Sequence, residues 1–377
     1  MRIGMIAPLE MRVPPPAYGG TEMVISLLTE ELVARGHEVT LFASGDSQTS
    51  ARLVPGSERY LRGAGYGSPA ALSLLNVLAC FDTSYKFDII HNHTCPEGMA
   101  LAEYADKPVV TTIHGAMANE LVTLFERYAG WYITISQSSK AQLPEKPRFA
   151  GVVYNAVDAA TYPYNAGPRK DYLLYLSRMS AEKGPDLAIE AAKRLRMPLI
   201  MAGNVSDLDA EFFHERVKPH IDGELIQYVG EADQVTKRGL LSEARCLLAP
   251  VTWAEPFGLF MAESMACGTP VIALRNGSTP EVVRHGVTGY VVDSVAEMAD
   301  AVANLGNIAP EACRTHVVEE FSIKRMTDRY LDAYETVLSS QPAPWQGMVA
   351  QPAIATLAGQ AIEEPAFEPY GRISADN

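Results

Sequence analysis

The stretch 249–273 reads APVTWAEPFGLFMAESMACGTPVIA, and its pattern predicts a strand, a loop, a helix and a second strand. The loop carries Glu255, and the helix opens at Phe257, Gly258 and Leu259. Gly258 lets backbone N–H groups approach a ligand closely. The start of a helix also offers unpaired N–H donors and the positive end of its dipole. The stretch therefore predicts a seat for an anion such as a diphosphate.

Two carboxylates, Glu255 and Glu263, flank this predicted seat. Because like charges repel, neither is suited to contact phosphates, whereas both are suited to accept hydrogen bonds from sugar or ribose hydroxyls. The spacing alone leaves a second interpretation open, in which Glu255 caps the helix and Glu263 is a solvated helix residue.

On both sides of this stretch, strand-like apolar runs alternate with helix-like stretches as far as residue 305. The expected strands are 3–7, 39–43, 88–91, 109–113, 132–135, 152–154, 172–176, 199–202, 226–229, 246–250, 271–274 and 290–292. The expected helices are 22–35, 186–195, 208–217, 235–244, 259–266 and 295–305. This alternation is typical of parallel sheets with helices on both faces, and here it occurs twice. The sequence thus predicts an α/β fold with two Rossmann-like, doubly wound domains.

The length of 377 residues fits two domains of about 150 residues each. Residues 158–170, with Pro163, Gly167 and Pro168, form the expected hinge, so we expect domains at 1–165 and 166–321. A terminal helix is expected at 322–338. We expect this terminal segment, residues 322–340, to pack back on the first domain. Residues 341–377 are rich in Pro, Ala and Gly, which predicts a poorly ordered tail.

Composition excludes several classes of protein. Apolar residues make up 47% of the chain and charged residues 20%, as in globular proteins. No run of about 18 apolar residues occurs, so we expect no transmembrane segment. The first eight residues are too short and too quickly polar for a signal peptide, and they predict a strand instead.

The net charge limits the expected binding partners, and the cysteine pattern indicates the cellular compartment. The net charge of −14 makes nucleic acid an improbable partner, because phosphate binding needs a basic surface. Five cysteines are scattered and never form a C-x-x-C pair, which argues against disulfides or structural zinc and favours a cytoplasmic location.

Further candidate residues follow other predicted strands. Gly19 and Gly20 form a glycine loop after the first strand, but they do not match G-x-G-x-x-G and a simple turn is the default interpretation. His114 follows the strand 109–113. His91 and His93 invite a metal interpretation, yet no cysteine or carboxylate cluster completes a ligand set, so we expect no metal site.

Two cations, Arg178 and Lys183, lie between a predicted strand and a predicted helix. This is the carboxyl end of a parallel sheet, where ligands bind in such folds. Two cations there would neutralise a diphosphate leaving group. The alternative is an exposed basic pair near a helix start.

These segments together resemble a known family. The pattern E-P-F-G-x-x-x-x-E followed by SMACGTPVIA is similar to the E-x7-E signature of glycosyltransferase family 4, retaining enzymes with the GT-B fold. The segment 176–184 resembles the family's G-R-x-x-x-E-K-G, with Ser177 where glycine is usual. The family's G-G-x-P-E is present at 277–281 with Ser278 replacing one glycine, which puts the backbone approach of that loop in doubt. The resemblance covers about residues 1–340.

The resemblance implies a GT-B fold with two domains facing across a cleft, the first binding the acceptor and the second the donor. It implies catalytic roles for Glu255, His114, Arg178 and Lys183. It implies donor binding by a larger set: Gly19, Gly20, Phe257, Gly258, Leu259, Glu263 and Glu281.

The implied reaction moves a sugar from a nucleotide-diphosphate sugar to a hydroxyl acceptor with retention of configuration. Glu255 would bind donor sugar hydroxyls and Glu263 the ribose. Arg178, Lys183 and the N–H groups near Gly258 would stabilise the diphosphate, so that no metal or other cofactor is expected. Uridine is the commonest base in the family, with guanosine and adenosine left open. The acceptor, whether sugar, glycan, lipid or small molecule, is not readable from the sequence.

Other interpretations remain open on the same architecture. A nucleotide-sugar epimerase would convert the donor alone, and a glycan phosphorylase would use inorganic phosphate and, commonly, pyridoxal phosphate. An inactive carbohydrate-binding protein is a third, although the full set of Glu255, Glu263, Arg178 and Lys183 argues against it. A homodimer is compatible with the sequence.

Overall fold

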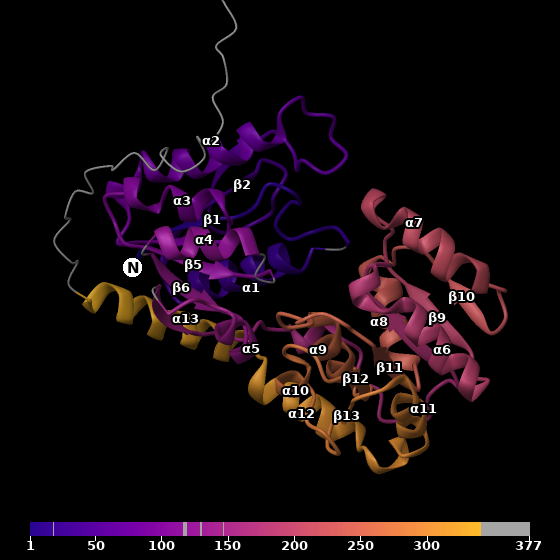
Figure 1. Ribbon diagram of the computed structural model, residues 1–377. Coiled ribbons are helices and arrows are strands. Elements are labelled where there is room, and N and C mark those ends of the chain that lie inside the picture. Colours follow the sequence, from indigo (N-terminus) through magenta and orange to yellow (C-terminus); the bar gives the residue numbers. More distant parts are fainter. Residues whose placement is uncertain (18, 116–118, 129, 146, 341–377) are drawn as a thin grey trace, which may run out of the picture. The chain divides into compact units, whose positions relative to one another are not determined.

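The computed structural model describes residues 1–17, 19–115, 119–128, 130–145 and 147–340, and the predicted tail at 341–377 lies outside this part. Two parallel sheets organise the chain, one of seven strands and one of six (Figure 1). The first has the order β3-β2-β1-β4-β5-β6-β7 and the second β10-β9-β8-β11-β12-β13. Each sheet carries helices, so the prediction of an α/β fold with two parallel-sheet domains is confirmed.

The strands of the first sheet are β1 (Arg2–Ile6), β2 (Glu38–Ser44), β3 (Arg52–Ser57), β4 (Ile89–Asn92), β5 (Val109–Ile113), β6 (Trp131–Thr134) and β7 (Arg148–Val152). Those of the second are β8 (Leu173–Leu176), β9 (Leu199–Ala202), β10 (Ile226–Tyr228), β11 (Cys246–Ala249), β12 (Val271–Leu274) and β13 (Gly289–Val292). Central strands such as β5, β8 and β11 are buried along their whole length, because helices cover both faces of a parallel sheet.

The longer helices are α1 (Gly20–Ala34), α2 (Pro69–Phe81), α4 (Asn119–Arg127), α6 (Pro185–Leu195), α8 (Gln234–Glu243), α9 (Leu259–Ala266), α11 (Val295–Ala303), α12 (Pro310–Glu320) and α13 (Ile323–Ser339). Shorter ones are α3 (Glu97–Ala100), α5 (Gln137–Ala141), α7 (Ala210–Phe212) and α10 (Thr279–Val282). None of the helices within the described ranges is both long and apolar enough to cross a membrane.

The strand order positions the functional residues. β1 pairs with both β2 and β4, and β8 pairs with both β9 and β11, so each sheet reverses its winding at one point. Crevices at the carboxyl ends of strands form at such switch points. The chain leaves β1 toward Gly19, leaves β8 toward Lys183 and leaves β11 toward Glu255.

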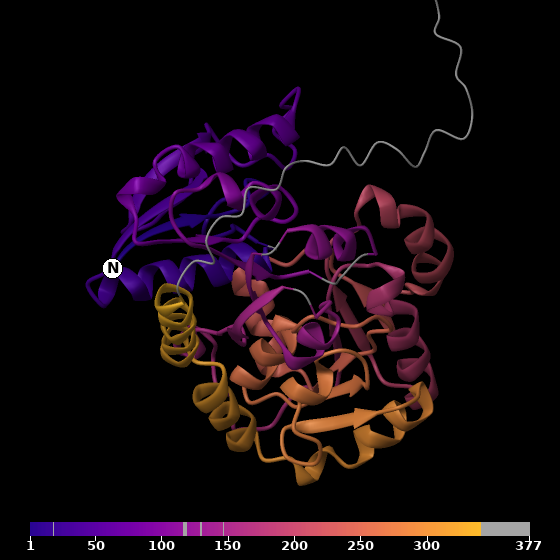
Figure 2. The same ribbon diagram turned by 60° about the vertical axis from the view of Figure 1, so that its left-hand side comes forward.

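The terminal helix α13 packs on the first sheet's side of the chain. It contacts α1 and β7, and both views show it running beside α1 (Figures 1 and 2). Its buried stripe shares a core with β1 and α1, and the stripe consists of Met326, Tyr330, Ala333, Tyr334 and Val337. The connecting stretch is held by the second half, since the Asn165 N–H donates to the Cys267 carbonyl at 3.1 Å.

The sequence pattern does not predict the two edge strands of the first sheet correctly. β3 was not predicted, and the strand expected at 152–154 instead lies at Arg148–Val152 as β7. An edge strand is half exposed and tolerates Pro and Gly, so it lacks the continuous apolar run of a buried strand. β3 contains Pro55 and Gly56, and β7 contains Gly151.

Candidate active site

A cavity of 410 Å³ lies at the carboxyl ends of the strands and is lined by residues from both halves of the chain. Ligand sites commonly have volumes of about 300–1,000 Å³. Its lining includes every predicted site residue except Arg178 and Glu281, namely Gly19, Gly20, His114, Lys183, Glu255, Phe257, Gly258, Leu259 and Glu263. The structure therefore brings together side chains that are up to 244 positions apart, from 19 to 263.

The loop after β11 presents the start of α9 to this cavity. Gly258 has a φ of +77°, in the left-handed region that favours glycine, and it precedes the first helical residue, Leu259. Within the described part of the chain no side chain caps α9, so its first N–H groups remain available to a ligand. The interpretation in which Glu255 caps this helix is therefore wrong.

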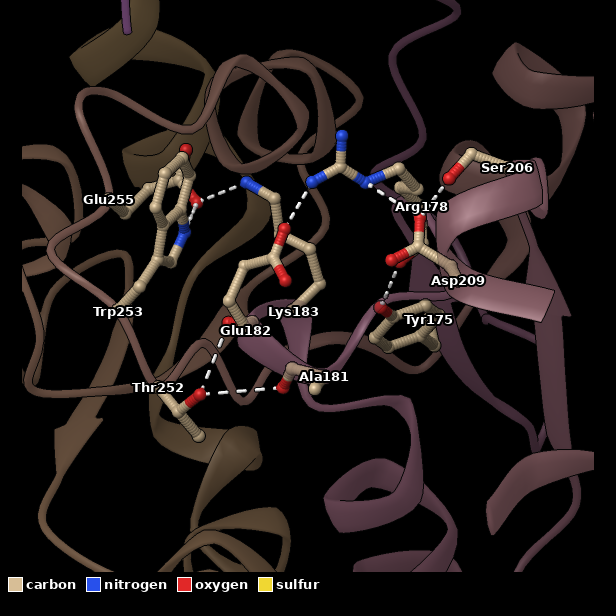
Figure 3. A network of polar contacts seen from close by, with 10 residues as sticks. All are labelled: Tyr175, Arg178, Ala181, Glu182, Lys183, Ser206, Asp209, Thr252, Trp253 and Glu255. Atoms are coloured by element: carbon tan, nitrogen blue, oxygen red, sulfur yellow. Dashed lines mark hydrogen bonds and ion pairs between the residues drawn. The ribbon is translucent and has the colours of Figure 1, made fainter. Parts of the chain in front are cut away.

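Glu255 forms a buried ion pair with Lys183 (Figure 3). Lys183 Nζ lies 2.5 Å from Glu255 Oε2, and the two side chains are only 10% and 7% exposed. The indole N–H of Trp253 donates to the same Oε2 at 2.8 Å, and the ammonium lies 4.5 Å from the centre of the indole ring. Because both donors use Oε2, Glu255 Oε1 is left to accept from a ligand.

Two loops meet at this ion pair. The Thr252 N–H donates to the Glu182 carbonyl at 2.9 Å. The Thr252 hydroxyl also donates to the Ala181 and Glu182 carbonyls at 3.4 Å, and these bonds tie the loop after β11 to the turn that carries Lys183 (Figure 3). Lys183 ends a short 3-10 turn, and Gly184 follows it with a φ of +67°. A Cβ on Gly184 would lie 2.2 Å from the Pro250 carbonyl oxygen, so only glycine allows this approach.

Arg178 lies beside the ion pair rather than in the cavity lining. Its guanidinium contacts the carboxylate of Glu182, and Arg178 Nε lies 3.4 Å from Asp209 Oδ2 (Figure 3). The two predicted cations, Arg178 and Lys183, therefore have different surroundings. Lys183 faces the cavity, whereas Arg178 is held by acidic neighbours.

Glu263 is not the solvated helix residue of the second interpretation. Glu263 Oε1 accepts a hydrogen bond from the Tyr162 hydroxyl at 2.6 Å. The same oxygen forms an ion pair with Lys237 Nζ at 2.7 Å. Burial and the neighbouring Glu263 carboxylate raise the pKa of the Tyr162 hydroxyl well above its usual range, so it stays a donor. Lys237 also lines the cavity. The sequence pattern does not single out Lys237, because a lysine on an amphipathic helix carries no distinguishing signal.

His114 stands at the end of a chain of buried histidines. His93 Nδ1 lies 2.8 Å from His114 Nε2, and the rings of His91 and His93 are tilted by 41° with their centres 3.9 Å apart. Burial lowers the pKa of His114 to about 4 and holds the pKa values of His91 and His93 well below their usual range, so all three are neutral near pH 7.

The ring nitrogens of His91 and His93 are already engaged. His91 bonds to the Tyr334 hydroxyl of α13 at 2.6 Å and to Thr112 Oγ1 at 2.7 Å. Across the described ranges, no three His, Cys, Asp or Glu side chains gather as metal ligands would.

A second cavity of 320 Å³ lies against the first sheet. Thr21 and His114 line both cavities, so the two adjoin at these residues. His93 also lines the second cavity.

Glu281 is placed on the backbone of the first half rather than in the main cavity. It accepts hydrogen bonds from the N–H groups of Gln137 and Ser138 at 2.8 and 2.7 Å and from the Tyr154 hydroxyl at 2.8 Å. These contacts cap the start of α5. The structure thus gives the predicted donor-binding residue Glu281 a bridging position between the halves.

The replaced glycine of the same segment does not disturb the loop. A Cβ on Gly277 would lie 2.2 Å from the Glu255 nitrogen, and Gly277 has a φ of +57°. The Ser278 N–H donates to the Glu255 carbonyl at 2.9 Å. The retained Gly277 makes the close approach that supports Glu255, so serine is tolerated at the next position.

Replacing Glu281 by Gln should lower the free energy of unfolding by about 1–3 kcal/mol, because hydrogen bonds to a charged acceptor are lost. Affinity for a nucleoside diphosphate should stay within about twofold, since Glu281 does not line the cavity. Urea unfolding and nucleotide titration measure the two effects, with E311Q on the exposed start of α12 as the matched control. A large loss of nucleotide affinity at unchanged stability would return Glu281 to the donor site.

Comparison with known proteins identifies the family. The model of glycosyltransferase family 4 matches residues 18–161, and that of glycosyl transferases group 1 matches residues 163–312. Glycogen synthase of Mycobacterium tuberculosis is 28% identical, with 81% of this chain and 86% of that protein covered. Phosphatidyl-myo-inositol mannosyltransferase of the same species is 27% identical, with 90% and 98% covered.

A solved structure has the same fold. The Anabaena protein HepE, in complex with UDP and glucose, superposes with a TM-score of 0.68 at 20% identity, covering 89% of this chain and all of that one. The two parallel sheets, the strand order and these matches lead to one conclusion. The chain belongs to glycosyltransferase family 4 and is a GT-B enzyme of the hexosyltransferase class.

Proposed function

We propose that the enzyme transfers a sugar from a nucleotide-diphosphate sugar, with UDP as the leaving group, to a hydroxyl acceptor with retention of configuration. The observation that carries this proposal is the main cavity, in which the uncapped start of α9 converges with Lys183, Glu255 and Glu263. The UDP found with the Anabaena relative supports uridine as the base.

The diphosphate fits the start of α9. The N–H groups after Gly258 and the positive end of the helix dipole favour an anion there. Lys183 lines the same cavity and can exchange its ion pair with Glu255 for one with the phosphates. These groups supply the charge stabilisation for which other transferases use a divalent metal.

The two acidic side chains suit hydroxyl groups. Glu255 Oε1 is available to accept from a hydroxyl of the donor sugar, while Trp253 and Lys183 hold its other oxygen. Glu263 contacts Tyr162 and Lys237 in the same cavity. Its carboxylate is suited to accept hydrogen bonds from the ribose hydroxyls.

The acceptor enters from the second cavity, which adjoins the first at Thr21 and His114. Its hydroxyl oxygen attacks the anomeric carbon on the face from which the diphosphate departs. The bond from that carbon to the phosphate oxygen breaks, and the hydroxyl proton passes to the released phosphate oxygen. This route depends on positioning, because both reactants are held by the protein in one orientation.

A thermal-shift panel of UDP, GDP, ADP and dTDP tests the donor assignment. A ligand at about 100 times its dissociation constant adds about 2.7 kcal/mol of stability, so UDP should raise the melting temperature most. The same panel on E263Q should give a smaller shift, because the amide is a weaker acceptor for ribose. A melt that none of the four nucleotides moves would overturn the proposal.

Metal independence and stereochemistry are tested on the donor that the panel selects. Excess EDTA should leave the initial rate unchanged, because Lys183 and the start of α9 stabilise the diphosphate. Proton NMR of the product should show the donor's anomeric configuration. A rate abolished by EDTA and restored by Mg²⁺, or an inverted anomer, would contradict the corresponding part of the proposal.

A further inference from the structure

The second cavity is lined by side chains whose hydrogen-bonding capacity is largely used inside the protein. His93 bonds to His114 and contacts Met5 Sδ at 3.1 Å. Thr94 donates to Asn92 at 2.7 Å, and Thr112 bonds to His91. These groups shape the cavity but have little left to offer a ligand.

Asn76 is engaged in the same way. Its amide nitrogen donates to the Ala7 carbonyl at 3.1 Å and to the Phe42 carbonyl at 3.3 Å. Its amide oxygen is buried without a hydrogen-bond partner among the described residues, and it lies 2.3 Å from where a Cβ on Gly56 would stand, so it faces the backbone of β3. Asn76 therefore fixes the wall without presenting a polar atom for recognition.

The polar groups of the described lining that keep capacity for a ligand include two hydroxyls, a carboxylate and the second ring nitrogen of His114. Thr21 and Ser73 line the cavity, and within the described ranges their hydroxyls form no hydrogen bond with another residue. Glu97, at the start of α3, is half-buried and has no cationic partner among the described side chains. A hydroxyl both donates and accepts, and an ionised carboxylate only accepts.

The charge of the lining has one sign. The described lining residues include Glu10 and Glu97 and no lysine or arginine. Glu10 is paired with Arg62 at 3.2 Å, and this guanidinium lines the main cavity instead. His93 and His114 add no charge near pH 7, because burial lowers their pKa values.

Apolar side chains complete the cavity. Leu9, Ile113 and Leu121 line it together with Pro8 and Cys95. Alternation of apolar surface with a few hydroxyl-binding groups matches a sugar ring, whose C–H faces pack on apolar atoms while its hydroxyls find polar partners.

We propose that the second cavity selects an uncharged polyhydroxy acceptor, a sugar or polyol end without phosphate or carboxylate, with Glu97 as the residue that repels anionic acceptors. The proposal rests on the proposed function, since it assigns the acceptor of the same reaction. A phosphorylated acceptor would bring negative charge to a site in which Glu10 already occupies Arg62 and Glu97 has no cationic partner among the described side chains, and such like-charge contacts are costly.

The test uses the full-length enzyme with the donor that the nucleotide panel selects. Initial rates of nucleoside diphosphate release are measured with acceptor pairs that differ by one phosphate: D-glucose and glucose 6-phosphate, myo-inositol and inositol 1-phosphate, glycerol and glycerol 3-phosphate. Wherever the unphosphorylated member accelerates release, its kcat/KM should exceed that of its partner by about tenfold or more.

Variants at Glu97 assign the discrimination to a residue. E97Q should narrow the ratio within each pair several-fold, because the amide removes the charge and keeps the shape. E97K should favour the phosphorylated member. E103Q is the matched control, since Glu103 is exposed on the next turn and does not line the cavity, and it should leave both rates as in the wild type.

The outcomes separate this inference from the proposed function. Equal or better use of the phosphorylated members, or unchanged ratios in E97Q and E97K, would overturn it. It would also be overturned if the enzyme binds a nucleotide and no unphosphorylated sugar or polyol of the panel accelerates release. Failure to bind any nucleotide would instead overturn the donor assignment itself.

Discussion

Replacing Lys183 by Ala should lower kcat about 100-fold or more. Lys183 is the cation beside the uncapped start of α9, and removing one preorganised group that stabilises developing charge typically costs about 10²–10³ in kcat. The other cations of the described lining, Lys237 and Arg62, are paired with Glu263 and Glu10 and are not expected to compensate. Steady-state release of the nucleoside diphosphate measures the loss.

The same substitution should also affect stability, and the two effects need separation. Glu255 would keep only the Trp253 N–H as a partner in a buried position, at a cost of about 3–5 kcal/mol. Urea unfolding defines conditions in which the variant is folded before rates are compared. K193A, which removes an exposed lysine of α6, is the matched control. A K183A enzyme within threefold of wild-type kcat/KM would rule out the proposed role.

Replacing Glu255 by Gln should change catalysis and nucleotide binding in opposite directions. A hydrogen bond from a sugar hydroxyl to a charged acceptor is worth about 1.5–3 kcal/mol, so kcat/KM should fall about 10- to 100-fold. UDP should bind several-fold more tightly, because Lys183 loses its competing carboxylate and a negative charge leaves the cavity. Isothermal titration and initial rates give the two readouts.

The double variant K183A/E255Q tests whether the pair acts as one unit. Residues in direct contact are non-additive, so the double variant should be destabilised by less than the sum of the single variants. E311Q serves as the control for carboxylate loss outside the cavity. Weaker UDP binding by E255Q, or strictly additive losses, would contradict the arrangement of Lys183 between Glu255 and the diphosphate.

Arg178 shows where a motif alone is insufficient. The sequence placed Arg178 and Lys183 at the carboxyl end of the same strand, and that placement holds. It did not reveal that Glu182 and Asp209 hold the guanidinium while Lys183 turns to Glu255. Side-chain partners such as Asp209, which comes from another segment, are invisible to local spacing.

The central elements were predictable because their signal is local. The helix expected at 259–266 coincides with α9, and the expected strands 199–202 and 271–274 coincide with β9 and β12. Buried strands and amphipathic helices have a recognisable pattern of apolar residues in the local sequence. The edge strands β3 and β7 do not, since half of their surface faces no core.

By itself, the sequence determined the repeated α/β alternation and the glycine before α9. It also determined that one glutamate, Glu255, precedes this helix and that another, Glu263, lies within it. Only the tertiary structure decided that Lys183 pairs with Glu255, that Lys237 joins Glu263, that Glu281 caps α5 and that a second, acidic cavity adjoins the first. The reason is that such partners meet through strand order, here β8 beside β11, and strand order is set by packing of the whole sheet rather than by any local pattern.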